Sequence, residues 1–159
     1  MRISDREITK FLLKFISEGD FVLDVGCGDC SRLNELNKLK NISAFGIDIS
    51  VPDKGIGNEI VCREMKAEDI DKLSGKFNLI FTAYSFHHFD NPEKFLAGAK
   101  NKLCWDGKLI IIEWKYGAVT SNPDEEYYKS GRIEKFLMDA GFKLENKIFK
   151  GDTRIFIAF

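Results

Sequence analysis

Short apolar runs alternate with amphipathic stretches along most of this chain. The apolar runs have the length of strands that are buried on both faces, as in a parallel sheet, and they lie at residues 21–25, 44–47, 60–62, 77–81 and 109–113. Apolar residues also recur at helical spacing, around residues 8–16, 33–39, 92–103 and 133–140. Strands that alternate with helices predict an α/β protein with a doubly wound parallel sheet.

Local signals predict where several elements begin and end. Ser4 and Glu7 form a capping-box pattern before the first helix, and Gly19 ends that helix. Pro92 is expected at the first position of a helix that runs to Leu103.

The second half of the chain carries two turn signals. Asp106-Gly107 is expected to turn the chain into the strand at 109–113. Residues 150–152 (Lys-Gly-Asp) are expected to join the last two strands, 142–149 and 153–159, into a hairpin that adds an antiparallel strand. Residues 50–59 hold one proline and two glycines and are expected to be irregular.

Composition narrows the class of protein. The chain has 159 residues, with 24 Lys and Arg against 25 Asp and Glu, so bulk charge favours neither nucleic acid nor an anionic membrane. The longest apolar runs are strand-sized, whereas a spanning helix needs about 20 residues. The charged N-terminus does not resemble a signal peptide. We therefore expect one cytoplasmic domain over residues 1–159, with reduced thiols.

Candidate ligand-binding residues follow the expected strands, because open α/β sheets bind ligands at the carboxyl ends of their strands. Gly26 and Gly28 let the backbone pass close to a ligand. Asp48 ends the second strand, where its carboxylate suits the two hydroxyls of a ribose. Asp24 would oppose a pyrophosphate but suits an amino group and a sulfonium, and Ser31 replaces the third glycine of a dinucleotide fingerprint. These residues favour S-adenosylmethionine over NAD.

Four motifs in chain order resemble the class I S-adenosylmethionine-dependent methyltransferases. VLDVGCGDCSRL at 22–33 resembles their glycine-rich motif I, and GIDIS at 46–50 resembles their acidic motif. Residues 77–114 resemble the stretch in which small-molecule members carry a His-His pair, and the last helix and hairpin resemble the family's final unit. The resemblance covers nearly the whole chain. It implies a Rossmann-like, doubly wound seven-stranded sheet of order 3-2-1-4-5-7-6, with strand 7 antiparallel.

The resemblance also implies roles for single residues. The turn from Asp24 to Gly28 would hold the methionine part of the cofactor, and Thr82 would lie near its amino group. Asp48 would bind the ribose, Ile49 would lie against the adenine, and Ala67 and Glu68 would flank the adenine edge. The residues implied to bind the cofactor are thus Asp24, Gly26, Cys27, Gly28, Asp48, Ile49, Ala67, Glu68 and Thr82. The implied product is S-adenosylhomocysteine, and no metal site is expected.

His87 and His88 are the only histidines, and they follow the fourth strand. His88 is the first candidate for a general base and His87 the second, while the alternative is that they pack locally. Aromatic residues flank the loop at 115–129, and we interpret them either as a lid or as a cover that shields the site from solvent. They are Trp114, Tyr116, Tyr127 and Tyr128.

Cys27 and Cys30 form a C-x-x-C pattern, which is typical of a redox pair or half a zinc site but also fits a spelling of motif I. We favour motif I, because Cys62 and Cys104 offer no second pair.

Three functions stay open at this point. The first is methyl transfer to an unidentified acceptor, for which we expect a small molecule. The second is a methyltransferase-like subunit that binds S-adenosylmethionine and supports a partner protein. The third, an NAD(P)-dependent oxidoreductase, is disfavoured by Asp24 and Ser31. Residues 82–85 read Thr-Ala-Tyr-Ser rather than Asn/Asp-Pro-Pro-Tyr, which argues against amine methylation of DNA bases. The oligomeric state is not indicated.

Overall fold

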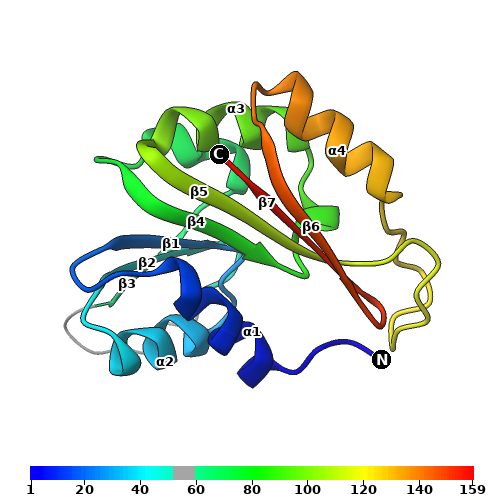
Figure 1. Ribbon diagram of the computed structural model, residues 1–159, viewed down its shortest axis with the longest axis horizontal. Coiled ribbons are helices and arrows are strands. Elements are labelled where there is room, and N and C mark those ends of the chain that lie inside the picture. Colours follow the sequence, from blue (N-terminus) through cyan, green and yellow to red (C-terminus); the bar gives the residue numbers. More distant parts are fainter. Residues whose placement is uncertain (52–59) are drawn as a thin grey trace.

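A computed structural model describes residues 1–51 and 60–159 of the protein. Its seven strands form one sheet of order β3-β2-β1-β4-β5-β7-β6 (Figure 1). The strands are β1 (Phe21–Val25), β2 (Ser43–Asp48), β3 (Ile60–Glu64), β4 (Phe77–Ala83), β5 (Leu103–Trp114), β6 (Leu144–Lys150) and β7 (Thr153–Ala158). β1 to β5 pair in parallel, and β7 is antiparallel to β5, which confirms the expected fold. The irregular segment expected at 50–59 lies mostly outside the described residues.

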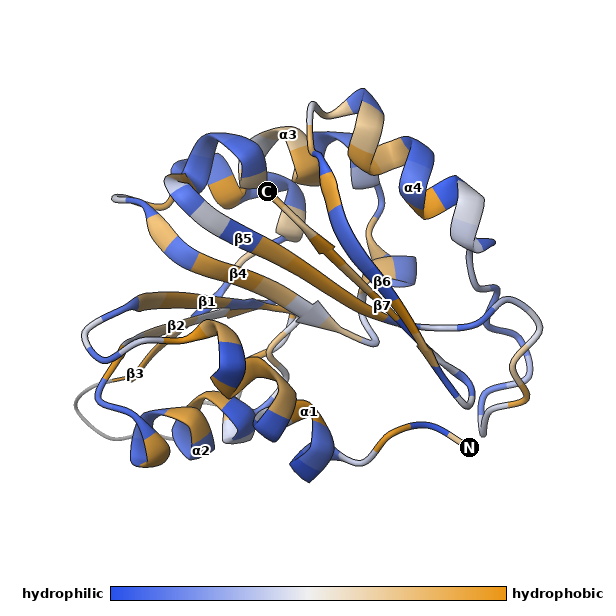
Figure 2. Ribbon diagram, viewed as in Figure 1, coloured by the Kyte–Doolittle hydropathy of each residue, from blue (hydrophilic) through white to orange (hydrophobic). Residues whose placement is uncertain are grey.

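Helices cover both faces of this sheet (Figure 1). α1 and α2 pack on one face, where Ile8, Leu12, Leu33 and Leu36 are fully buried. η2, α3 and α4 pack on the other. Figure 2 shows the resulting apolar interior along the central strands. The helices are α1 (Asp5–Leu12), η1 (Leu13–Phe15), α2 (Ser31–Leu39), η2 (Ala67–Lys72), η3 (Phe86–His88), α3 (Pro92–Lys102) and α4 (Ser130–Asp139). None of these described helices has the length and apolar character to cross a membrane.

The capping box, the start of α3 and the final hairpin turn are confirmed. The prediction that Gly19 ends the first helix is wrong, because α1 ends at Leu12 and η1 at Phe15. The Ser4 hydroxyl accepts from the Glu7 N–H, and the Glu7 carboxylate accepts from the Ser4 N–H at 2.8 Å. Pro92 opens α3, whose first turn is capped by the Asn91 side chain. Gly151 takes a φ of +58° at the tip of the final hairpin, a conformation that favours glycine.

The expected turn at Asp106-Gly107 is wrong, because β5 already begins at Leu103 and runs through both residues. The pairing with β4 shifts between Phe77, which faces Leu103, and Leu79, which faces Lys108. This bulge absorbs the extra residues of β5 without ending the strand. A Cβ at Gly107 would lie 2.9 Å from the Phe77 carbonyl oxygen, so the close approach of the two strands needs a glycine here.

The buried hydroxyl of Thr153 joins three distant parts of the chain. It accepts from the Ile3 N–H at 3.2 Å and lies 2.6 Å from the Tyr84 hydroxyl. Tyr84 directly follows β4 and has a φ of +56°, which is uncommon for a residue with a bulky side chain. This left-handed residue turns the chain from β4 into η3, so β7 helps to fix the start of the segment that carries both histidines.

Candidate functional site

A cavity of about 530 Å³ lies at the carboxyl ends of β1, β2 and β4. Among its lining residues are six that the sequence predicted for the site, namely Gly26, Asp48, Ile49, Ala67, Glu68 and His88. Met65 and Ser85, which belong to stretches expected to follow strand ends, also line it, and so does Phe89, which was not predicted. The cavity therefore lies where the fold class places its ligands.

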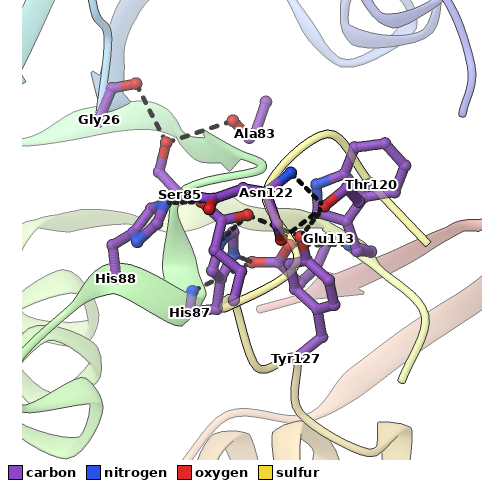
Figure 3. A network of polar contacts seen from close by, with 11 residues as sticks. Gly26, Ala83, Ser85, His87, His88, Glu113, Thr120, Asn122 and Tyr127 are labelled. Atoms are coloured by element: carbon purple, nitrogen blue, oxygen red, sulfur yellow. Dashed lines mark hydrogen bonds and ion pairs between the residues drawn. The ribbon is translucent and has the colours of Figure 1, made fainter. Parts of the chain in front are cut away.

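Gly26 and Ser85 bring β1 and the segment after β4 into contact. Gly26 has a φ of +81°, and a Cβ built there would lie 2.5 Å from the Ser85 Cβ. The Ser85 hydroxyl donates to the carbonyl oxygens of Gly26 and Ala83, each at 3.3 Å (Figure 3). Glycine is thus required at position 26 for two reasons, backbone conformation and space.

Asp48 is held in place by the backbone on both sides of it. One carboxylate oxygen accepts from the Gly28 N–H at 2.9 Å, and the other accepts from the Ser50 N–H at 3.1 Å. Because each oxygen can accept more than one hydrogen bond, both can still serve a ligand.

The adenine side of the cavity was predicted through Ile49, Ala67 and Glu68. The Ile49 side chain is exposed at the rim, whereas Ala67 is buried at the start of η2. Glu68 accepts from the Asn91 N–H at 2.9 Å, so its carboxylate ties η2 to the start of α3.

A second hollow of about 310 Å³ adjoins the first through Gly26, and it is lined by Cys27, Gly28 and residues of α2. The two hollows together border the whole glycine turn of motif I. The predicted methionine-binding residues Cys27 and Gly28 belong to this second hollow.

Asp24 and Thr82 line neither hollow, since both are fully buried in the sheet. Both oxygens of Asp24 and the hydroxyl of Thr82 lack a hydrogen-bond partner among the described residues. Burial raises the pKa of Asp24 to about 7, while the Arg32 charge opposes this shift and the Asp48 charge adds to it. Unpaired buried polar groups are costly, so these two side chains are poised for a partner that the described residues do not supply.

The expectation of reduced thiols is wrong, because Cys30 and Cys62 form a disulfide. The bond links the N-cap of α2 to β3, two elements that the sheet pairing brings together across Gly46. A Cβ at Gly46 would lie 2.7 Å from the sulfurs of Cys27 and Cys30, so this glycine makes room for them. Disulfides are rare in cytosolic proteins, and the predicted cytoplasmic location therefore stays a prediction.

His87 forms a buried pair with Glu113, the last residue but one of β5. The His87 Nδ1 lies 2.9 Å from one Glu113 oxygen, which also accepts the His87 N–H at 3.1 Å. The other Glu113 oxygen accepts from the Trp114 N–H at 2.7 Å. The His87 side chain is 3% exposed and Glu113 is fully buried, whereas the His88 ring is 55% exposed at the cavity. Glu113 lies at the end of the fifth expected strand, one of the strand ends where the sequence predicted ligand contacts, although no role was assigned to it.

Glu125, in the 115–129 loop, faces both histidines (Figure 3 shows the surrounding side chains). Its two oxygens lie 3.7 Å from the His87 Nε2 and 3.5 Å from the His88 Nε2. Tyr127 donates to Glu125 at 2.6 Å and Asn122 donates at 2.8 Å. The Tyr127 hydrogen bond is the main reason that the pKa of Glu125 is lowered.

The aromatic residues around this loop differ in their surroundings. Tyr127 is buried, with its ring 4.8 Å from that of His87 and 6.0 Å from that of Trp114. Tyr128 packs against Phe86, but Tyr116 is exposed. Tyr127 therefore covers His87, and Tyr116, which is exposed, covers neither histidine.

Comparison with known proteins identifies the class. Residues 2–145 match a family model that is described as a methyltransferase domain. The chain belongs to this methyltransferase family, and its fold is that of the class I S-adenosylmethionine-dependent methyltransferases.

Among solved structures, an S-adenosylmethionine-dependent methyltransferase from Aquifex aeolicus is 23% identical, with a TM-score of 0.76 over 99% of this chain and 98% of that one. A methyltransferase of Haloferax volcanii, solved with its Trm112 activator, is 15% identical, with a TM-score of 0.77 over 97% and 87%. A 1,6-didemethyltoxoflavin-N1-methyltransferase of Burkholderia thailandensis, solved with 1,6-didemethyltoxoflavin and S-adenosylhomocysteine, is 16% identical, with a TM-score of 0.76 over 97% and 76%.

The chain spans less than a quarter of the length of the curated relatives that it matches. An uncharacterised protein of Methanocaldococcus jannaschii is 49% identical over 51 residues, which are 32% of this chain and 17% of that protein. An uncharacterised protein of Synechococcus is 28% identical over 102 residues, which are 57% and 24% of the two chains.

Proposed function

We propose that this chain binds S-adenosylmethionine in the cavity at the carboxyl ends of β1, β2 and β4 and transfers its methyl group to a small-molecule acceptor. The observation that carries the proposal is Asp48, a carboxylate at the end of β2 that backbone N–H groups hold at the cavity. Residues 1–159 would act as one methyltransferase domain, since all described strands join one sheet.

The chain's residues divide the work of binding. The Asp48 carboxylate would accept hydrogen bonds from the two ribose hydroxyls. The Gly26–Gly28 turn would leave room for the rest of the cofactor. Ile49, Ala67 and Glu68 would surround the adenine. The oxygens of Asp24 and Thr82, which have no partner in the part of the chain that the structure describes, suit the cationic methionine end. Bound S-adenosylmethionine supplies the activated methyl group, and the main contribution of the chain is to position it against the acceptor.

The acceptor would lie near Ser85 and His88, where the cavity borders the histidine segment. His88 is the more accessible histidine, and His87 is the better oriented one because Glu113 holds its ring. Either could take a proton from an acceptor that must lose one. The Burkholderia relative acts on a small molecule, which supports this acceptor class.

The cofactor proposal can be tested without knowing the acceptor. Calorimetry with S-adenosylmethionine, S-adenosylhomocysteine and NAD should show binding of the first two and no comparable heat with NAD. Asp48→Ala should weaken binding roughly tenfold to a hundredfold, since hydrogen bonds to a charged group contribute about 1.5–3 kcal/mol.

The matched control for this test is Asp106→Asn, an exposed carboxylate near the start of β5, at the far end of the sheet. It should bind like the wild-type protein. Tight binding of NAD with none of S-adenosylmethionine would contradict the proposal, and so would an Asp48→Ala variant that keeps full affinity.

A second candidate is a subunit that binds S-adenosylmethionine and supports a partner protein. The Haloferax structure, in which a methyltransferase is held by an activator, favours this possibility. Mass spectrometry of the ligand that is carried through purification separates the two candidates. S-adenosylhomocysteine supports turnover, whereas unreacted S-adenosylmethionine favours the supporting role.

A further inference from the structure

We propose that His87, His88 and Glu125 form a binding site for a divalent first-row transition metal such as Zn²⁺, beside the cofactor cavity. One donor atom from each of the three side chains lies within 4.8 Å of the others. Two imidazoles and one carboxylate are a donor set for such ions, whereas Mg²⁺ and Ca²⁺ prefer oxygen ligands alone.

The spacing of the donors fits ligands of one ion better than hydrogen-bond partners. The Glu125 oxygens lie 3.7 Å from the His87 Nε2 and 3.5 Å from the His88 Nε2, which is too long for a hydrogen bond. With bonds of about 2.1 Å, two ligands of a tetrahedral zinc ion lie about 3.4 Å apart. The gap between carboxylate and imidazoles therefore has the size that a shared cation needs.

The free nitrogen of His87 is the second, independent observation. The His87 side chain is 3% exposed, and its Nε2 has no hydrogen-bond partner among the described residues. Glu113 accepts a hydrogen bond from the other ring nitrogen, Nδ1, which leaves a lone pair on Nε2. A carboxylate behind a histidine is the usual arrangement at metal sites, because it fixes the tautomer and the ring orientation.

The Glu125 carboxylate is also held in place by hydrogen bonds, here from its own loop. Tyr127 donates to one of its oxygens and Asn122 to the other, and the Tyr127 hydroxyl also lies 2.8 Å from the Thr120 hydroxyl. Two of the three donors are thus positioned before any ion binds. Glu113 and Tyr127 are positioning residues in this site.

A second group of possible metal ligands consists of the sulfurs of Cys27, Cys30 and Cys62, which also lie close together. Two of these sulfurs are joined in the disulfide and cannot act as thiolates. Burial also raises the pKa of the Cys27 thiol to about 12, which disfavours the thiolate that a metal needs. The histidine cluster is therefore the better candidate.

With an ion bound, the histidine lone pairs are used in coordination, so the role of a general base applies only to the metal-free protein. Three protein ligands leave coordination positions for a further ligand. Because His88 lines the cofactor cavity, that ligand could be an oxygen or nitrogen atom of the acceptor. This last step rests on the proposed function, whereas the metal site itself does not.

The test uses tag-free, chelator-treated protein without cofactor. Titration with Zn²⁺ in calorimetry should show one ion per chain, and Mg²⁺ should not compete. His87→Ala and Glu125→Gln should weaken binding more than about 100-fold, and Tyr127→Phe, which removes only a hydroxyl, should weaken it about 10–100-fold. Glu126→Gln, an exposed neighbour of Glu125, should bind zinc like the wild type.

Titration with Co²⁺ then identifies the donor atoms by absorption. The expected spectrum has no sulfur-to-cobalt charge-transfer band. Such a band, the absence of stoichiometric binding, or undiminished binding by His87→Ala and Tyr127→Phe would overturn the inference. If zinc binds as expected while S-adenosylmethionine does not bind at all, the proposed function fails and the metal site stands.

Discussion

Two pairs of buried polar side chains lie near the carboxyl edge of the sheet, and each pair consists of one carboxyl group and one threonine hydroxyl. The pairs differ in whether these groups have hydrogen-bond partners. Asp24 and Thr82, on β1 and β4, are fully buried and have no partners among the described residues. Glu113 and Thr153, on β5 and β7, are also fully buried, but each has hydrogen-bond partners from other elements.

The difference separates two ways in which a fold prepares a site. An unpaired buried group destabilises the free protein and gains its partner when a ligand binds. A paired group stabilises the free protein and fixes the orientation of its neighbours, as Glu113 fixes His87. We therefore propose that the β1–β4 half serves ligand binding and that the β5–β7 half serves positioning.

The largest expected effect is at the two buried carboxylates. The pKa of Asp24 is about 7 in the folded protein, against about 4 when unfolded, so between these values only the native state holds the proton. Stability of the wild type should fall as pH rises through this window, by about 4 kcal/mol in total. Asp24→Asn removes this loss, so its free energy of unfolding at pH 8 should exceed that of the wild type. Urea unfolding at pH 5 and pH 8 measures the difference.

Glu113→Gln is the matched substitution in the other half, and it should destabilise the protein, because an amide replaces one of the two accepting oxygens. Calorimetry should also show that Asp24→Asn loses affinity for S-adenosylmethionine. If both variants lost stability, the two halves would not differ in the way proposed.

The next effect is at Gly26, inside the β1–β4 half, where the turn after β1 contacts Ser85 after β4. Gly26→Ala should destabilise the protein by about 2–3 kcal/mol, because strain at positive φ adds to the clash with the Ser85 Cβ. Gly19→Ala is the control, since Gly19 has a φ of +85° with open space around it, and it should lose only about 1 kcal/mol. Adding Ser85→Gly should recover much of the loss at Gly26 in thermal unfolding. Equal losses of stability at Gly19 and Gly26, with no recovery in the double variant, would show that the contact between position 26 and Ser85 has no effect on stability.

The smallest effect is at the two threonines. Thr82→Val replaces an unpaired buried hydroxyl and should stabilise the protein by up to about 1 kcal/mol, whereas Thr153→Val breaks two contacts and should destabilise it by about 1 kcal/mol or more. Chemical denaturation of the two variants gives both values. The same sign for both would contradict the comparison.

Apolar runs and helix caps predicted the parallel strands and most element boundaries, because buried parallel strands are continuous apolar runs and helix caps are local signals. The sheet order came from the resemblance to the class I methyltransferases. The sequence did not predict the start of β5, since the bulge at Phe77–Leu79 depends on the neighbouring strand. The Cys30–Cys62 disulfide was missed for a similar reason. Its cysteines are 32 residues apart and meet only through the pairing of β2 with β3.

The site was predictable where it follows strand ends and not where it depends on the loop. Asp48 and His88 line the cavity because parallel strands end at one edge of a sheet. Glu125 lies in an irregular segment, and no periodicity or motif indicated that it would face the histidines. Its position results from Tyr127 and Asn122, which only the folded loop brings to it.

The contacts of the Thr153 hydroxyl with Ile3 and Tyr84 determine when the site can be completed during protein synthesis. The hydroxyl that meets Tyr84, at the entrance to the histidine segment, belongs to the final hairpin. A ribosome makes the chain from its N-terminus at about 5–20 residues per second. The glycine turn and both histidines therefore leave the ribosome seconds before β7 does. A nascent chain that still lacks β7 has the residues of the site but not the contact that secures Tyr84.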